Sequence, residues 1–297
     1  MGAAHGNAGV RTRIAAEIVA IFATPVVLAA CAIANFNQTA LLTLVVVLAS
    51  IGIFFASYEA SRPRLRDIMP TVVLAALAAT GRILFAPIPD FKPVSAIAII
   101  AGVAFGRKSG FMVGALAALA SNFFFGQGPW TPWQMYAWGL VGYGAGLLAM
   151  VPAKRRVIGS KNSCRARSGE ATGIASDSAY PVAPDGETES AALLPHQART
   201  DKENRALATR RLIDAHPTIV YAYGFLVCLG YGFILNAWSI LSFFHAQASG
   251  WAGILAVYAT ALPFDIVHGV ATVVFLLALY GPWRRKLERV RRKFGLA

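Results

Sequence analysis

Long apolar runs separated by short basic connectors constrain the fold of this chain more than any other feature of its sequence. A helix of about 20 apolar residues crosses the hydrocarbon core of a bilayer, and runs of this kind recur from residue 14 to residue 280. Charged residues make up only 14% of the chain, against about a quarter in soluble domains. We therefore expect an all-α integral membrane protein, with spans at Ile14–Ala34, Ala40–Tyr58, Ile68–Ala86, Val94–Phe105, Gly110–Phe125, Pro132–Val151, Thr218–Phe244 and Trp251–Tyr280.

The basic residues predict the orientation of these spans. When the N-terminus is placed in the cytoplasm, all of the 27 Lys and Arg residues except Arg82 and Lys92 fall on the cytoplasmic side. This distribution is the one that the positive-inside rule requires, so we expect both termini in the cytoplasm. The formal charge of +13 then reflects topology and contact with anionic lipid, and we expect no nucleic-acid partner.

Composition also predicts how the chain is divided. Residues 1–66 form an N-terminal two-helix hairpin with a basic connector, and residues 67–156 and 212–297 form a six-helix core. The polar segment 157–211 contains few aromatic residues, and it is expected to be a disordered cytoplasmic insert because it cannot bury enough apolar surface. Cys31, Cys164 and Cys228 lie far apart, so we expect neither a disulfide framework nor a metal site.

The segment between the fifth and sixth spans is unusually rich in aromatic and uncharged polar residues. It has the sequence SNFFFGQGPWTPWQMYAW and covers residues 121–138. Aromatic walls with a few hydrogen-bonding groups are typical of a pocket for a bulky, mostly neutral ligand. The alternative is an aromatic belt at the membrane interface, which accounts for Trp and Tyr but not for the clustered Gln, Asn and Pro.

Several polar residues lie within the predicted spans, where they are costly and often functional. We expect Arg82 to contact a ligand or to form an ion pair with Asp90 or Asp265; the alternative is that it reaches the outer surface. Asp265 and His268 are three residues apart and share a helix face, where they serve a ligand or merely join helices through a mutual hydrogen bond. Asn236 is expected to face the same cavity or to join helices. Glu17 is expected to form an interfacial ion pair with Arg13.

Catalytic motifs are missing from the sequence. It contains no phosphate-binding Gly-rich loop with Lys, no serine nucleophile elbow and no paired-His zinc motif. An enzyme that uses Asp265 and His268 as acid and base is one alternative function. A self-sufficient secondary transporter is another, although no internal repeat of the kind common in such transporters is evident.

One combination of motifs in the sequence comprises Gly81-Arg82, Phe91-Lys92-Pro93, Gly102, Gly106, Gly110-Phe111, the block Ser121–Gln134, and Leu262-Pro263-Phe264-Asp265 followed by His268 and Phe275. This combination resembles the substrate-binding S components of energy-coupling factor (ECF) vitamin transporters. It is most similar to those associated with cobalamin uptake. The resemblance covers Ile68 to the C-terminus without the insert. The N-terminal hairpin and the insert depart from a minimal S component.

The resemblance implies a six-helix S-component core in a prokaryotic cell membrane, with no enzymatic activity and no cofactor. It also implies a transmembrane coupling subunit and two ATPase subunits on other chains, which rotate the S component to present a captured vitamin to the cytoplasm. Ala75 and Ala79 match the small-residue motif that meets the coupling subunit. The substrate-binding residues expected on this basis are Arg82, Asp90, Lys92, Asn122, Gln127, Trp130, Trp133, Gln134, Asn236, Asp265 and His268.

Overall fold

The computed structural model describes residues 15–23, 25–27, 30, 39–61, 63–151, 213, 216–243 and 246–294, and these residues form helices without any strand. The chain divides into two compact units, of which the first comprises Met1–Val151 with His216–Ala297 and the second Pro152–Ala215. The predicted insert, 157–211, lies outside the described residues, as do Arg13, Cys31 and Cys164. The all-helical fold class is thus confirmed, while the disorder of the insert stays a prediction.

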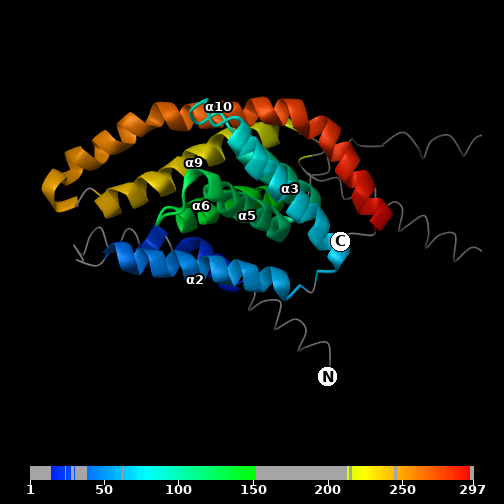
Figure 1. Ribbon diagram of the computed structural model, residues 1–297, viewed down its shortest axis with the longest axis horizontal. Helices are drawn as coiled ribbons and strands as arrows, with labels where there is room; N and C mark the ends of the chain where they lie inside the picture. The colour runs from blue at the N-terminus through cyan, green and yellow to red at the C-terminus, as the bar shows by residue number, and fades with distance from the viewer. Residues whose placement is uncertain are drawn as a thin grey trace, which may run out of the picture. The chain divides into compact units, whose positions relative to one another are not determined.

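Each predicted span corresponds to a helix in the first unit (Figure 1). The N-terminal segment Ala15–Val27 is followed by α2 (Thr39–Glu59), α3 (Leu65–Leu84), α4 (Val94–Phe105), α5 (Arg107–Phe125), α6 (Thr131–Leu148), α9 (Thr218–Phe243) and α10 (Ala246–Phe294). By length and composition, four helices can cross a membrane: Leu65–Leu84, Arg107–Phe125, Thr218–Ile240 and Gly250–Val290. These helices identify a multi-pass membrane protein, while the number of crossings and the orientation of the termini stay predictions.

Helix α4 occupies the centre of the unit, and its bounds are those predicted from the sequence. Nearly all of its side chains are buried, and it packs against α3, α5, α6, α9 and α10. Its apolar run has no polar face because the helix is enclosed by protein on all sides. The helix ends at Gly106, where a φ of 92° turns the chain directly into α5.

Glycines bring α4, α5 and α6 into backbone contact. A Cβ atom at Gly102 would lie 2.1 Å from the carbonyl oxygen of Gly142, and one at Gly142 would lie 2.1 Å from the carbonyl oxygen of Gly110. Small residues permit such close helix approach, so Gly102 and Gly110 serve the packing of these helices. Gly106 does not pack closely, since a Cβ there would meet open space; it serves the turn between α4 and α5 instead.

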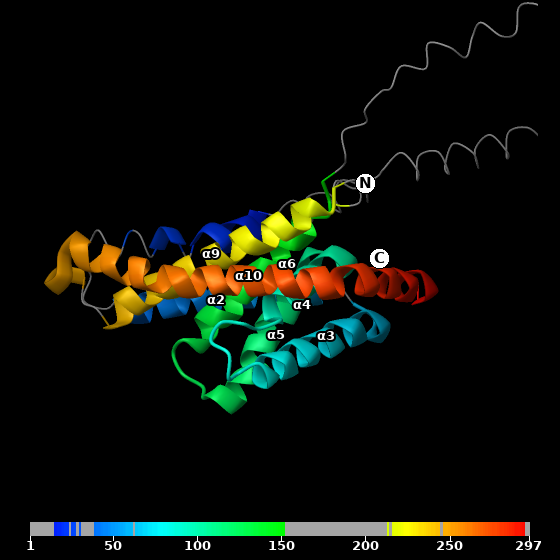
Figure 2. The same cartoon turned by 90° about the horizontal axis from the view of Figure 1, so that it is seen from above.

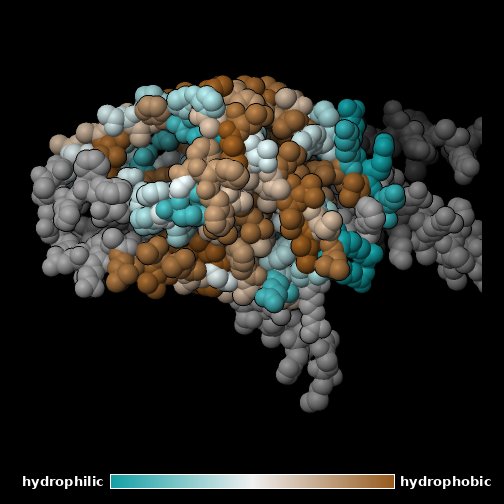
Figure 3. All heavy atoms as spheres, in the orientation of Figure 1, coloured by the Kyte–Doolittle hydropathy of each residue, from teal (hydrophilic) through white to brown (hydrophobic). Residues whose placement is uncertain are grey.

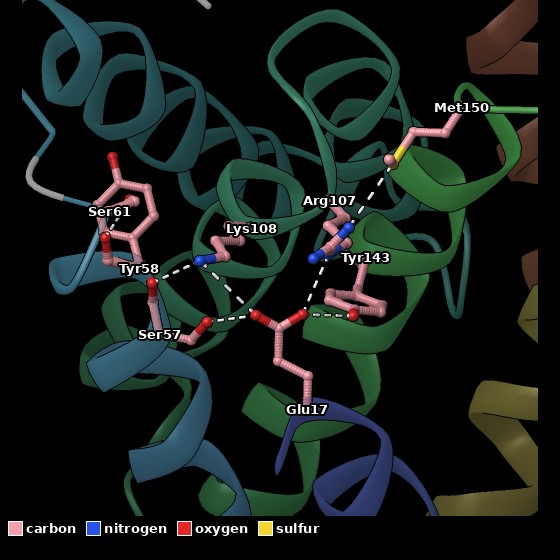
Figure 4. Close-up of polar contacts among 8 residues, drawn as sticks. All are labelled: Glu17, Ser57, Tyr58, Ser61, Arg107, Lys108, Tyr143 and Met150. Carbon is pink, nitrogen blue, oxygen red and sulfur yellow. Dashed lines mark hydrogen bonds and ion pairs between the residues drawn. The ribbon is translucent and has the colours of Figure 1, made fainter. Parts of the chain in front are cut away.

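The N-terminal segment is fixed to the rest of the unit through the carboxylate of Glu17, which is only 1% exposed (Figure 4). One oxygen accepts hydrogen bonds from Arg107 Nε at 3.1 Å and from the Tyr143 hydroxyl at 2.7 Å. The other accepts a hydrogen bond from the Ser57 hydroxyl and lies 3.7 Å from Lys108 Nζ. A single carboxylate therefore joins the N-terminal segment, α2, the start of α5 and α6.

The partner that the sequence predicts for Glu17, Arg13, lies outside the described residues, so that ion pair stays a prediction. The described cationic partners come from the start of α5, far along the chain. A second attachment lies deeper in the unit, where the Tyr136 hydroxyl donates to the backbone carbonyls of Ala20 and Ile21. In α2, the Phe54 ring stacks on Phe111 with 4.0 Å between centroids.

Helices α2 and α3 lie against different neighbours in the unit (Figure 2). Helix α2 packs on α5, α6 and α9, whereas α3 packs on α4 and α5. The outer face of α3 exposes the apolar residues Val72, Val73 and Leu77. Hydrophobic residues cover much of the face drawn in Figure 3, and hydrophilic residues gather at the end where α10 terminates. This division is the one expected of a protein with an apolar membrane zone.

Candidate functional site

A cavity of about 290 Å³ lies between the end of α3, the connector 85–93 and helices α6, α9 and α10. Figure 3 shows a hollow with hydrophilic atoms beneath α10. The cavity is lined by Arg82, Asp90, Lys92, Gln134, Trp138, Tyr231, Gly232, Leu235, Asn236, Ala261, Phe264, Asp265 and His268. The structure thus brings together most of the polar residues that the sequence assigned to a ligand site, although they come from five separate segments.

Arg82 is buried at the outer end of α3, with 7% of its surface exposed. Its Nη1 donates to Ser121 Oγ and to Asn122 Oδ1, both at 2.6 Å. Its guanidinium carbon lies over the rings of Phe125 and Trp138, at 4.7 and 4.8 Å from their centroids. The side chain is therefore held in place inside the protein, and the alternative that it extends to the outer surface is excluded.

The ion pair predicted for Arg82 is not formed. No carboxylate oxygen of the described residues, including those of Asp90 and Asp265, lies within 4.0 Å of its nitrogens. Its Nε is buried without a hydrogen-bond partner. A guanidinium carries five N–H donors, and the two bonds at Nη1 leave the rest without an acceptor among the described residues.

Asn122 links Arg82 to the first turn of α6. Its side-chain oxygen accepts from Arg82, while its Nδ2 donates to Thr131 Oγ1 at 2.9 Å and to Gln134 Oε1 at 2.8 Å. Thr131 in turn donates to Gln127 Oε1 at 2.9 Å. Since the side-chain oxygen of Gln134 accepts one of these hydrogen bonds, its amide nitrogen remains as a donor at the cavity wall. Asn122 itself is fully buried and supports the wall from behind.

His268 is oriented by Ser95, which lies in the first turn of α4. Trp138 Nε1 donates to Ser95 Oγ at 3.2 Å, and Ser95 Oγ lies 2.8 Å from His268 Nε2. A hydroxyl oxygen can accept two hydrogen bonds and donate one, so either Ser95 or His268 can be the donor in this second contact. Tyr231 meets the imidazole edge to face at 5.0 Å.

Asp265 lies one helical turn before His268 but does not bond to it. Its Oδ2 accepts a hydrogen bond from Asn236 Nδ2 at 3.3 Å. The carboxylate rests on the backbone of α9 at Gly232, where a Cβ atom would come within 1.9 Å of Oδ1. The predicted shared face of Asp265 and His268 is confirmed by their common place on the cavity wall, whereas the alternative of a mutual hydrogen bond is wrong.

The connector between α3 and α4 supplies Asp90 and Lys92. Asp90 has a φ of 53°, a left-handed conformation that Asp tolerates better than most residues. Burial lowers the pKa of Lys92, a nearby Asp90 raises it in part, and Arg82 lowers it further. Phe85 and Phe91 in this connector pack against Phe275 of α10. The connector thus forms an ordered rim that carries one charge of each sign.

The remaining predicted residues lie away from the cavity. Gln127 is exposed and donates to the carbonyl of Leu119 at 3.2 Å. Trp130 is half-buried against Gly128, and Trp133 is completely buried without lining the cavity. Ala75 and Ala79, predicted to meet a partner, are 4% and 6% exposed because their face of α3 is turned into the unit.

The sequence analysis missed Ser95 and Tyr231. Ser95 was detectable as a hydroxyl at the start of an otherwise apolar span, where a polar side chain requires a partner. Tyr231 lies five residues before Asn236, a spacing that does not place two helix residues on one face, so no local pattern pointed to it. The described residues contain no group of three or more His, Cys, Asp or Glu side chains that could hold a metal ion.

Comparison with known proteins adds one finding. The family model described as "ECF transporter, substrate-specific component" matches residues 66–280. No curated protein and no solved structure gives a significant match. The matched region begins at the second residue of α3 and contains every residue that lines the cavity, whereas the N-terminal segment and α2 precede it.

Proposed function

We propose that this chain, which belongs to the substrate-specific components of ECF transporters, captures a vitamin from outside the cell. Members of the family are transporter subunits and not enzymes. The observation that carries the proposal is the cavity, whose polar and aromatic lining comes from separate elements of the matched region. Enclosed sites with a few oriented polar groups are typical of tight small-molecule binding.

The transport cycle that we propose requires partners on other chains. A transmembrane coupling subunit and two ATPase subunits supply the energy, and the bound ligand is delivered to the cytoplasm of a prokaryote when this subunit rotates in its plasma membrane. The outer face of α3 is the proposed docking surface, since Val72, Val73 and Leu77 are exposed there. Ala75 and Ala79 support that surface from the buried side, where their small size keeps α3 close to its neighbours.

The size of the cavity bears on the identity of the vitamin. Its volume of about 290 Å³ lies at the lower end of the range of about 300–1,000 Å³ that is usual for small-molecule pockets. A small cyclic vitamin fits this space, whereas a corrin macrocycle requires the connectors around residues 85–93 and 126–131 to open. We therefore propose a small vitamin as the substrate, and cobalamin, which the resemblance favoured, becomes one outcome of the test.

Mass spectrometry of the purified chain tests the ligand, and reconstitution tests the transport function. We expect a small molecule to co-purify, and we expect its affinity to fall in Asp265→Asn and Asn236→Ala but not in Ser239→Ala, which changes α9 outside the cavity lining. Uptake into proteoliposomes should require the coupling subunit, both ATPase subunits and ATP. Uptake by this chain alone would contradict the proposal and favour a self-sufficient transporter. A co-purifying corrinoid would show that the cavity opens.

A further inference from the structure

Two cations on the cavity wall have no counter-charge in salt-bridge contact. Arg82 and Lys92 both line the cavity, and no carboxylate oxygen of the described residues lies within 4.0 Å of either. Asp90 and Asp265 line the same cavity, but at greater distances. A buried cation without a paired negative charge is costly, so this arrangement indicates that something absent from the chain completes it.

The guanidinium of Arg82 is prepared for an anion of defined shape. Ser121 and Asn122 occupy Nη1, and the Phe125 and Trp138 rings both contact the guanidinium. The Nε–Nη2 edge is left without an acceptor, and Nε is buried. That edge forms a fork of two parallel N–H groups, which matches the two oxygens of a carboxylate.

Different chemistry is present on the α9 and α10 side of the cavity. Asp265 has one oxygen bonded to Asn236, and its carboxylate can accept further hydrogen bonds. Trp138, Tyr231 and Phe264 provide aromatic surface in the same cavity. A ligand that fits this lining therefore has an anionic group, a flat or cyclic body and N–H donors.

We infer that the substrate is a small cyclic carboxylic acid with N–H groups, whose carboxylate is bound by Arg82 and Lys92 and whose N–H groups face Asp265. The inference rests on the transport function proposed above and specifies its substrate class. It also accounts for the two cations and for Asp265, because each of these groups gains a complementary partner when a ligand of this kind binds.

Matched acid and amide probes test the inference on the purified full-length chain. Biotin is compared with biotinamide, and 4-aminobenzoate with 4-aminobenzamide, by isothermal titration calorimetry. Both acids are small and carry N–H groups away from the carboxylate. A hydrogen-bonded charged group contributes about 1.5–3 kcal/mol, so we expect at least one acid to bind about 10- to 100-fold more tightly than its amide.

Variants then assign the preference to its residues. Arg82→Gln should abolish the preference for the acid, whereas Arg82→Lys should retain part of it. Lys92→Gln, in a connector outside the helices, should reduce the preference and serves if Arg82→Gln does not fold. Arg285→Gln makes the same charge change on an exposed residue at the other end of α10 and should leave the preference unchanged.

Three results would overturn the inference: equal binding of acid and amide, a preference that survives both Arg82→Gln and Lys92→Gln, or no binding of either acid at millimolar concentration. Co-purification with the coupling subunit distinguishes failure of the inferred substrate class from failure of the proposed function. ATP-dependent uptake of a neutral vitamin refutes the carboxylate but keeps the function. A chain that associates with no coupling module refutes the function whatever it binds.

Discussion

Replacement of Glu17 by Gln should loosen the N-terminal hairpin, because the buried carboxylate contacts Ser57, Tyr143, Arg107 and Lys108 together. Gln keeps the shape of the side chain but removes its charge. It also replaces one acceptor oxygen by an NH₂ group that faces donors. The change therefore removes the negative charge that Glu17 presents to Arg107 and Lys108 and leaves at least one donor facing an NH₂ group.

The magnitude follows from the burial of the three charged groups. Loss of one partner of a fully buried ion pair costs about 3–5 kcal/mol. Glu17 is 1% exposed, but the side chains of Arg107 and Lys108 are 20% and 24% exposed and can turn toward water when released. The lower end of the range, about 3 kcal/mol, is thus expected. At about 2–4 °C per kcal/mol for a chain of this size, the midpoint of thermal unfolding should fall by about 6–12 °C.

Thermal unfolding of the purified chain, followed by Trp fluorescence, measures this fall, and hydrogen exchange locates it. Protection should decrease in α2 while α4 stays protected. Glu59→Gln, at an exposed position near the end of α2, is the matched control and should change the midpoint little. The double variant Glu17→Gln with Arg107→Gln should lose less than the sum of the single variants. If Glu17→Gln behaves like the control, the carboxylate does not hold the hairpin and our account of it is wrong.

Three other predictions concern the core and the cavity. Gly142→Ala should destabilise the chain by about 1–3 kcal/mol, since the added Cβ would lie 2.1 Å from a backbone oxygen. Gly52→Ala is the control, because a Cβ at Gly52 meets open space, and thermal unfolding compares the two variants. Ser95→Ala removes the hydrogen-bond partner of Trp138 and His268. A buried polar group that loses its partner costs about 1–3 kcal/mol of stability, and the ligand affinity measured by titration should also fall. Because the pKa of Lys92 is lowered, mainly by burial, affinity for an acidic ligand should decline as the pH rises toward the ordinary lysine pKa of about 10.4. Lys92→Arg, which stays charged, should remove that decline, and an unchanged pH profile in this variant would refute the role of Lys92.

The sequence located the helices well because most of their ends are marked locally. Val94–Phe105 follows a Pro and stops at Gly106, and both bounds agree with α4. The end of α10 differs, since it continues to Phe294 beyond the predicted Tyr280. The apolar run ends near Tyr280, but a charged helix in water needs no apolar run to continue.

The composition of the aromatic segment was a poorer guide than its helical register. Gln134 and Trp138 are four residues apart and share one face of α6, and both line the cavity. Trp133 and Tyr136 lie on other faces and are buried away from it. Some residues of the segment therefore line the cavity and others pack in the interior, and only the period of the helix distinguishes the two sets. The partners of Glu17 were beyond sequence reasoning, because Arg107 lies 90 residues away and nothing local fixes that contact.

Helix α10 continues well beyond the residues that line the cavity. The helix runs unbroken from the cavity residue His268 to Phe294, a rise of about 39 Å. A tilt of about 20°, the average for membrane helices, displaces one end of this rod by about 13 Å relative to the other. Its distal end carries Arg284, Arg285, Lys286 and Arg289, each of which costs about 3 kcal/mol in hydrocarbon. The basic end is thereby held at the aqueous boundary, so in the rotation that we propose for this subunit the ligand end is the end that moves.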